Sequence, residues 1–196
     1  MNLSLKKSLG QNFLIDQKIL NLIVETGNVQ KSDAVIEVGP GTGALTKRIL
    51  EGEPKSFTVI EKDTRFVDIL KKNFGNKIEI MNDDMMSIAY ENFRNKNFIV
   101  FGNLPYNVST QILTKWIKMN NLNEFCKKFI LMFQKEVADR IVSKVNTSNY
   151  GRLSILSNWR MKINKIIDIE PGSFNPPPKV ESSLLTLNPK RIFQVK

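Results

Sequence analysis

A glycine-rich stretch near residue 40 has the residue types of a loop that binds a nucleotide-like ligand. Positions 39, 41 and 43 are glycines, and they follow the largely apolar run Ala34–Val38. Glycines permit a tight turn from a strand into a helix and let a ligand approach the backbone. Glu61 follows 22 residues beyond Gly39, where a carboxylate can accept hydrogen bonds from both ribose hydroxyls of an adenosine ligand. These features alone also fit a nicotinamide or flavin enzyme, or a glycine turn without a ligand and an acid that caps a helix.

The other acids around the loop favour S-adenosylmethionine over a dinucleotide. Glu37 lies two residues before the first glycine, where its carboxylate could face an ammonium group, and no basic residue occurs in the loop before Lys47. Asp83 and Asp84 follow the next apolar run, where the amino group of an adenine could donate to them. A zwitterionic adenosyl ligand suits this acid-rich set better than a pyrophosphate does.

The segment Asn103-Leu-Pro-Tyr106 resembles the Asn/Asp-Pro-Pro-Tyr motif of enzymes that methylate exocyclic amino groups. The N6 lone pair of adenine is delocalised into the ring and is a poor nucleophile. The side-chain oxygen of Asn103 and a backbone carbonyl of Leu104 or Pro105 can each accept one N6 hydrogen, and so direct the lone pair at the methyl group. Tyr106 can stack on a base that is flipped out of its helix. The methylated ammonium is strongly acidic, so no histidine is needed, and the chain has none.

The elements that would position these residues alternate between short apolar strands and amphipathic helices. Strands are predicted at Ala34–Val38, Phe57–Glu61, Ile78–Met81, Phe98–Phe101, Lys128–Phe133, Ile163–Ile169 and Ser182–Leu187. Helices are predicted at Asp16–Thr26, Gly43–Glu51, Thr64–Asn73, Ser109–Met119, Gln134–Ser143 and Tyr150–Met161. The alternation predicts an α/β fold with a parallel sheet, and the last two strands, with no helix between them, predict a terminal antiparallel hairpin.

Further segments, taken with these motifs, resemble the ribosomal RNA adenine N6,N6-dimethyltransferases. They are Leu9-Gly-Gln-Asn-Phe-Leu14, Gly102-Asn-Leu-Pro-Tyr-Asn-Val-Ser-Thr110, Gln134-Lys-Glu136, Tyr150-Gly-Arg-Leu-Ser154 and Phe174-Asn-Pro-Pro-Pro-Lys-Val180, which leads to Ser182. The resemblance implies a Rossmann-like class I S-adenosylmethionine-dependent methyltransferase fold, with a mostly parallel seven-stranded sheet and helices on both faces. It also implies dimethylation of two adjacent adenosines in the 3′-terminal hairpin of 16S rRNA, in the small ribosomal subunit or its precursor.

Three alternatives stay open. A macrolide-resistance 23S rRNA methylase would use the same chemistry on another RNA. A non-catalytic rRNA-binding assembly factor would have no need for the Asn103–Tyr106 motif, and a nucleotide-linked oxidoreductase leaves that motif unexplained.

Position by position, the resemblance implies a set of site residues. The cofactor would contact Asn12, Leu14, Gly39, Gly41, Glu61, Asp84 and Asn103. The catalytic set would be Asn103, Leu104, Pro105, Tyr106 and Phe174. In this set Phe174 sandwiches the flipped adenine against Tyr106, and the alternative for Phe174 is an ordinary place in the core. Asp83 is the alternative to Asp84.

The charge of the chain predicts an anionic partner. It has 29 Lys and Arg against 19 Asp and Glu, a formal net charge of +10. Neutralised phosphates release counterions, so nucleic acid is the leading candidate. The residues predicted to bind RNA are Lys7, Lys135, Arg140, Arg152 and Lys179, with Lys6 beside the first of them. The alternative is a diffuse positive surface in which no single cation matters.

Absent residue types exclude several other functions. Without histidine there is no Ser-His-Asp triad and no Cys-His pair, and we expect no metal site. The single cysteine, Cys126, excludes an internal disulfide and fits a reducing cytoplasm. The longest apolar runs fall far short of the roughly 20 residues of a membrane-spanning helix. No signal peptide is evident at the N-terminus. We therefore expect a cytoplasmic monomer that does not enter a membrane.

The predicted domain organisation has two parts. Residues 1–15 form a basic N-terminal lead-in that contributes to the cofactor site, and residues 16–190 form the methyltransferase domain. The small helical C-terminal domain that the family normally carries is expected to be absent from this chain.

Overall fold

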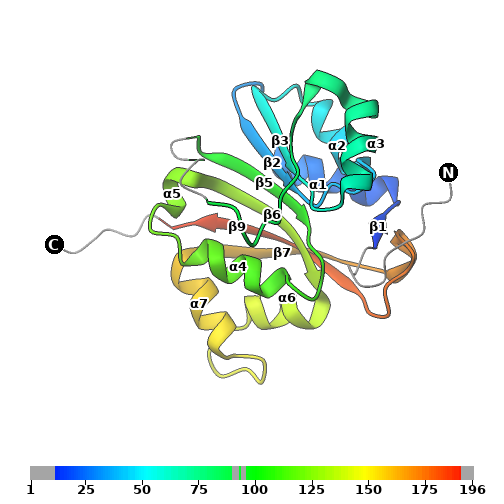
Figure 1. Ribbon diagram of the computed structural model, residues 1–196. Coiled ribbons are helices and arrows are strands. Elements are labelled where there is room, and N and C mark those ends of the chain that lie inside the picture. Colours follow the sequence, from blue (N-terminus) through cyan, green and yellow to red (C-terminus); the bar gives the residue numbers. More distant parts are fainter. Residues whose placement is uncertain (1–11, 90–92, 94–95, 191–196) are drawn as a thin grey trace.

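A twisted seven-stranded sheet in the order β4-β3-β2-β5-β6-β9-β7 forms the centre of the molecule (Figure 1). The computed structural model describes residues 12–89, 93 and 96–190. The strands of this sheet are β2 (Ala34–Val38), β3 (Ser56–Ile60), β4 (Glu79–Met81), β5 (Phe98–Asn103), β6 (Cys126–Gln134), β7 (Met161–Ile169) and β9 (Ser182–Pro189). The five strands β4, β3, β2, β5 and β6 are mutually parallel, as predicted. The largely apolar composition of β2, β3, β5 and β6 matches burial on both faces, whereas the edge strand β4 is partly exposed.

The last strand is inserted between two earlier ones. β9 pairs antiparallel with β6 on one side and with β7 on the other, so that Ser182 lies opposite both Gln134 and Ile169. The predicted antiparallel hairpin of β7 and β9 is confirmed. Its insertion next to β6, which leaves β7 at the edge, was not predicted.

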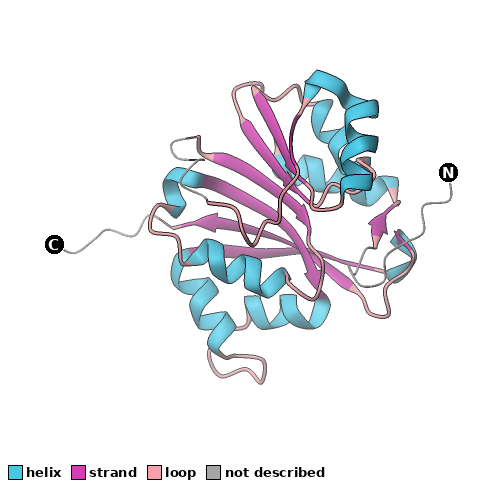
Figure 2. Ribbon diagram, viewed as in Figure 1, coloured by secondary structure: helices cyan, strands magenta, loops and turns pink. Residues whose placement is uncertain are grey.

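Helices cover both faces of the sheet (Figure 2). The helices are α1 (Gln17–Gly27), α2 (Ala44–Leu50), α3 (Thr64–Phe74), α4 (Ser109–Ile117), α5 (Leu122–Phe125), α6 (Lys135–Val142) and α7 (Arg152–Arg160), with the 3₁₀ turns η2 (Gly75–Lys77) and η4 (Pro171–Ser173). Buried side chains of α1, α2 and α3 form one apolar core with one face of the sheet. Side chains of α4 and α6, with partly buried ones of α7, form a second core with the other face. This arrangement is the predicted Rossmann-like α/β fold.

A separate two-stranded ladder joins the beginning of the described chain to a segment near its end. β1 (Phe13–Leu14) pairs antiparallel with β8 (Phe174–Asn175). The amides of Ile15 and Asp16 continue this connection by donating to the carbonyl of Ser173, at 2.9 and 3.3 Å. Strands of two residues have no periodicity, so the sequence did not predict them. The ladder holds Phe13 and Leu14 against the domain.

The described helices include none that is long and apolar enough to cross a lipid bilayer.

Candidate functional site

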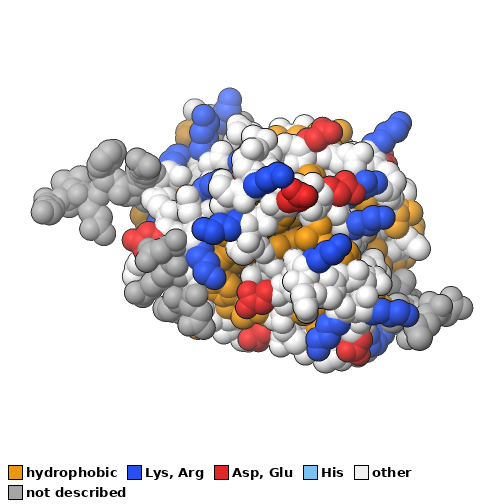
Figure 3. Space-filling model, turned by 90° about the horizontal axis from the view of Figure 1, so that it is seen from above, with side chains coloured by type: hydrophobic (Ala, Val, Ile, Leu, Met, Phe, Trp, Pro, Cys, Tyr) orange, Lys and Arg blue, Asp and Glu red, His pale blue; other side chains and the backbone are white. Residues whose placement is uncertain are grey.

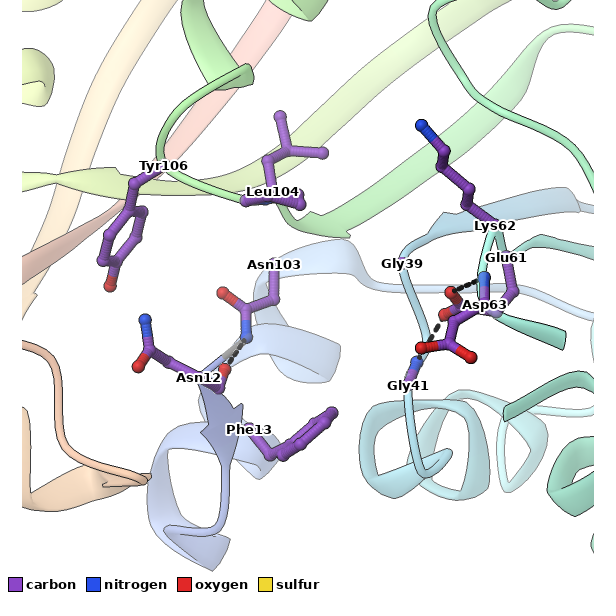
Figure 4. A pocket seen from close by; sticks show the side chains of 11 residues that line it. Asn12, Phe13, Gly39, Gly41, Glu61, Lys62, Asp63, Asn103, Leu104 and Tyr106 are labelled. Atoms are coloured by element: carbon purple, nitrogen blue, oxygen red, sulfur yellow. Dashed lines mark hydrogen bonds between the residues drawn. The ribbon is translucent and has the colours of Figure 1, made fainter. Parts of the chain in front are cut away.

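The carboxyl ends of β2, β3 and β5 meet at a cleft, where ligands of open α/β sheets bind. The residues that line this pocket are Asn12, Phe13, Gly39, Gly41, Glu61, Lys62, Asp63, Asn103, Leu104, Pro105 and Tyr106 (Figure 4). A second pocket shares Gly39, Glu61, Lys62 and Pro105 with the first and extends towards Asp83 and Asp84. The two pockets therefore form one elongated cleft. Six of the predicted cofactor residues line it, and Leu14 lines a third pocket that borders Gly39 and Asn103.

The ring of Phe13 in β1 packs on the glycine loop. Gly39 and Gly41 have φ angles of 68° and 55°, in the left-handed region that favours glycine. A Cβ atom on Gly41 would lie 2.6 Å from the ring of Phe13, so only a glycine fits beneath this ring. Phe13 in turn packs edge-on against Phe66, with ring centroids 5.3 Å apart. The loop and β1 are thus fitted to each other.

Glu61 is buried at the end of β3, with only 7% of its surface exposed. One carboxylate oxygen accepts the amide of Gly41 at 3.1 Å and the other accepts the amide of Asp63 at 2.8 Å. Burial raises the pKa of Glu61, and the two amide hydrogen bonds oppose this rise. A carboxylate has about four lone-pair sites, so acceptor capacity is left for ligand hydroxyls.

Glu37 lies deeper, at 2% exposure, and borders the third pocket. The hydroxyl of Thr46 donates to it at 2.7 Å. Burial raises the pKa of Glu37 to about 8; the Thr46 hydrogen bond opposes this rise and the nearby charge of Glu61 adds to it. In the ligand-free protein Glu37 is therefore mainly neutral at pH 7, and a cation beside it would favour the ionised form.

Two acids border the far half of the cleft. Asp84 accepts a hydrogen bond from Lys62 at 2.8 Å and another from the amide of Met86 at 2.9 Å, and these lower its pKa. The carboxylate of Asp83 accepts a hydrogen bond from the backbone amide of Asp84 at 2.6 Å. Both line the pocket, with Asp84 the more buried of the two. Lys115 of α4 donates to the carbonyl of Met86 and, at 3.2 Å, to that of Ile88. These bonds link the segment after Asp84 to α4.

Asn103, the last residue of β5, is oriented by the backbone of Asn12. Its side-chain nitrogen donates to the backbone carbonyl of Asn12 at 2.9 Å. The side-chain oxygen therefore points the other way, towards the side of the cleft where Tyr106 lies (Figure 4). An oriented acceptor beside an aromatic ring is the arrangement that the sequence predicted for binding an amino group of a base. Tyr106 itself is half-buried, and its hydroxyl lies 2.5 Å from the hydroxyl of Ser182 in β9.

Phe174, which was predicted to stack on the flipped adenine, lies in the core of the structure. Only 2% of its surface is exposed, and it packs in the core on the α1 side of the sheet. It does not line the cleft beside Tyr106. Phe174 pairs with Leu14 in the β1–β8 ladder, and the two side chains share this core. The stacking role of Phe174 stays a prediction.

The predicted RNA-binding residues do not share one environment. Lys7, like Lys6, lies outside the described residues. Lys135 is ion-paired with Glu181 and lies 3.5 Å from Asp168. Arg140 pairs with Glu136 one helical turn away, at 2.5 Å. Arg152 and Lys179 are exposed.

The surface distribution of charge also differs from a single basic stripe. On the face seen in Figure 3, Lys and Arg side chains surround apolar surface and are interspersed with acids. The two ion pairs and this distribution favour the diffuse alternative for Lys135 and Arg140. Among the described residues there is no group of three or more His, Cys, Asp or Glu side chains that could hold a metal ion.

Several residues of the site were not predicted from the sequence. Phe13, Lys62 and Asp63 line the cleft; Phe13 and Lys62 are adjacent in sequence to predicted residues, and Asp63 lies two residues after Glu61. That adjacency was the available signal. Thr46 and Ser182 contact site residues from other elements. No local pattern marks Thr46, and the sequence marks Ser182 only as the residue to which the segment Phe174–Val180 leads.

Comparisons with known proteins agree with this geometry. The family model described as "Ribosomal RNA adenine dimethylase" matches residues 2–195. The chain is 50% identical over 188 residues to the ribosomal RNA small subunit methyltransferase A of Pelagibacter ubique (strain HTCC1062), covering 96% of this chain and 71% of that protein. It is 38% identical over 190 residues to the protein of the same name from Rhizobium meliloti (strain 1021), covering 95% and 69%.

The chain is also similar to solved structures of RNA methyltransferases. A dimethyladenosine transferase from Plasmodium falciparum superposes with a TM-score of 0.81 at 35% identity, covering 91% of this chain and 63% of that one. The 23S rRNA methyltransferase ErmE superposes with a TM-score of 0.78 at 25% identity, covering 94% and 72%. The chain thus spans between about three fifths and three quarters of the length of these proteins.

Proposed function

Because the chain belongs to the ribosomal RNA adenine dimethylase family, we propose that it dimethylates N6 of two adjacent adenosines in the 3′-terminal hairpin of 16S rRNA. The observation that carries this proposal is the orientation of Asn103. Its amide nitrogen is bonded to Asn12, which leaves its oxygen as an acceptor beside Tyr106. We propose the small ribosomal subunit or its precursor as the substrate, a cytoplasmic location and a monomeric enzyme.

The cleft has the donors and acceptors that S-adenosylmethionine requires. When bound, this cofactor supplies a methyl group on a positively charged sulfonium. Glu61 accepts hydrogen bonds from the two ribose hydroxyls, and Asp84 accepts one from the adenine amino group. Glu37 lies where an ammonium group would favour its ionised form. The open approach over Gly39 and Gly41 gives the ligand room at the backbone, since neither residue has a side chain.

The methyl acceptor is held by the residues that follow β5. The side-chain oxygen of Asn103 accepts one N6 hydrogen and the carbonyl of Leu104 or Pro105 accepts the other. These two hydrogen bonds draw the nitrogen towards tetrahedral geometry and direct its lone pair into the cleft. The ring of Tyr106 supports the plane of the flipped adenine. After methyl transfer the acidic N6 proton leaves to solvent without a dedicated base.

Methyl transfer to defined ribosomal particles tests this function. We expect radiolabelled S-adenosylmethionine to methylate small subunits that lack the modification, with label in N6,N6-dimethyladenosine at two adjacent positions. Labelling of naked 23S rRNA fragments instead would support the resistance-methylase alternative. A protein that binds rRNA but shows neither methyl transfer nor cofactor binding by calorimetry would be an assembly factor.

A further inference from the structure

Tyr106 is attached to the fold at both ends of its side chain. Its backbone belongs to the turn after β5, and its hydroxyl contacts Ser182, which is 76 residues further along the chain. The two oxygens are 2.5 Å apart, and either hydroxyl can be the donor. A phenol fixed at its Cβ and at its hydroxyl has a fixed long axis, so the place of its ring is set by both attachments.

Ser182 is a rigid attachment point. It is fully buried at the start of β9 and lies in register with Gln134 of β6 and Ile169 of β7. Strands on both sides therefore restrain its backbone. The phenol cannot be displaced by a small shift of one loop, because its partner belongs to the central sheet.

The residues on each side of Ser182 are held as well. The carbonyl of Glu181 accepts the amide of Lys135 at 2.9 Å, and the two side chains form an ion pair. The hydroxyl of Ser183 donates to Asp168 at 2.6 Å. Successive residues of a strand face opposite sides, so Ser183 does not share the surroundings of Ser182. This makes Ser183 a matched control: it is equally buried and is also hydrogen-bonded through its hydroxyl.

We propose that Ser182 is a positioning residue that holds the ring of Tyr106 where the methyl-acceptor adenine stacks. This inference rests on the proposed function, and it concerns how the base is oriented rather than how the cofactor binds. A Tyr106 ring released from Ser182 would rotate about its side-chain bonds, and the adenine above it would lose the alignment of N6 with the Asn103 oxygen. An error of about 1 Å in such alignment can reduce a rate by roughly 100-fold.

Ser182→Ala removes the attachment and leaves the cofactor residues in place. We expect its turnover on small subunits to fall about tenfold, with cofactor affinity within twofold of the wild type. Ser182→Thr keeps a hydroxyl and should recover much of the activity. Ser183→Ala should retain turnover, even where it lowers thermal stability. A purely structural role would instead make turnover follow the folded fraction in all three variants.

Tyr106→Phe breaks the same contact from the other side. If the hydroxyl pair acts as a unit, the double variant Ser182→Ala/Tyr106→Phe should be no slower than either single variant, whereas independent effects would multiply. Multiplying effects would overturn the proposal. This cycle also covers the case in which Ser182→Ala folds poorly, because Tyr106→Phe leaves β9 unchanged.

A readout without catalysis separates this inference from the proposed function. An RNA hairpin with 2-aminopurine at one of two adjacent adenosine positions reports stacking through its fluorescence. We expect the wild type and Ser183→Ala to quench the flipped base and Ser182→Ala to quench it less. Equal quenching and equal turnover in Ser182→Ala would overturn the positioning role. A wild type that quenches but never transfers a methyl group would contradict the proposed function and leave the role of Ser182 in base stacking supported.

Discussion

Asn103, Glu61 and Glu37 show how individual side chains are prepared for a ligand. The side-chain amide of Asn103 donates a hydrogen bond to a backbone carbonyl. The carboxylate of Glu61 accepts hydrogen bonds from two backbone amides, and that of Glu37 accepts one from a hydroxyl. In each case contacts within the protein use part of the hydrogen-bonding capacity and fix the orientation of what remains. Little reorganisation is then required when a ligand binds, which is the property that makes such groups effective.

Replacing Asn103 should separate methyl transfer from cofactor binding. We expect Asn103→Ala to lower single-turnover methylation by about 100-fold or more, since one acceptor of the N6 hydrogens is lost in the transition state. Cofactor affinity, measured by calorimetry, should stay within a few-fold. Asn123→Ala, at an exposed asparagine that bonds the carbonyl of Lys190, is the control. An unchanged single-turnover rate in Asn103→Ala would remove Asn103 from the mechanism.

The buried Glu37 should make the stability of the ligand-free protein depend on pH. Its pKa is raised to about 8 in the folded state from 4.5, so the unfolded chain loses this proton at lower pH. The contribution of Glu37 to stability therefore declines as the pH rises from about 4.5 to about 8. We expect Glu37→Gln to be more stable than the wild type at pH 8, by an amount on the order of a few kcal/mol, with a smaller advantage at pH 5.

Urea unfolding at both pH values measures this difference. Asn21→Gln, which exchanges one uncharged side chain for another at an exposed position of α1, is the control. A constant difference between Glu37→Gln and the wild type at pH 5 and pH 8 would contradict a raised pKa.

At the scale of elements, the site depends on a contact between the glycine loop and the β1–β8 ladder. β1 places Phe13 over Gly41, and the hydrogen bond of Gly41 to Glu61 links the loop to the end of β3. β1, the loop between β2 and α2, and the end of β3 are therefore coupled. A substitution at Gly41, which contacts both Phe13 and Glu61, should therefore affect the cofactor site directly.

Substitutions at two glycines should distinguish the effect of backbone strain from the effect of the contact with Phe13. Gly41 and Gly75 have similar φ angles of 55° and 53°, but a Cβ on Gly41 meets Phe13 whereas one on Gly75 meets nothing within 4 Å. Gly75 has a ψ angle of −128°, outside the left-handed helical region, so Gly75→Ala should cost about 1–3 kcal/mol of stability from strain alone and leave cofactor affinity unchanged. Gly41→Ala should also weaken cofactor binding, by about tenfold or more. Equal cofactor affinity in the two variants, measured by calorimetry, would show that the contact with Phe13 is dispensable.

At the scale of the whole molecule, the net charge of +10 is only partly available to a polyanion. Lys135, Arg140, Lys127 and Lys165 each form ion pairs with acidic side chains. The exposed pair of Arg140 and Glu136 contributes little to stability, and all four pairs offset the local potential that a phosphate would meet. The exposed cations Arg152 and Lys179 are thus better candidates for rRNA contacts than Lys135 and Arg140.

The salt dependence of rRNA binding distinguishes these two sets. If Arg152 and Lys179 each contact a phosphate, neutralising both to Gln should reduce the slope of log K against log salt by about 1.5. The matched variant Lys135→Gln/Arg140→Gln should change the slope less. Cofactor affinity should be constant in both. A larger change of the slope in Lys135→Gln/Arg140→Gln would show that Lys135 and Arg140 contact the RNA.

The sequence by itself determined the parts of this protein that depend on local pattern. Apolar runs and amphipathic periods located the seven strands of the sheet and six helices to within a few residues. Spacing placed Gly39, Glu61 and Asn103 after or at the ends of parallel strands, and such ends meet at one edge of a sheet. Their convergence in one cleft followed from topology alone.

Only the tertiary structure decided which distant residues contact one another. The insertion of β9 beside β6 brings Ser182 to Tyr106, and the β1–β8 ladder places Phe13 on Gly41 and turns Phe174 into the core. The ion pairs of Lys135 likewise join segments that lie far apart in sequence. Local propensity has no information about such contacts, because they form only when the whole sheet is assembled and the best packing of all its elements is selected.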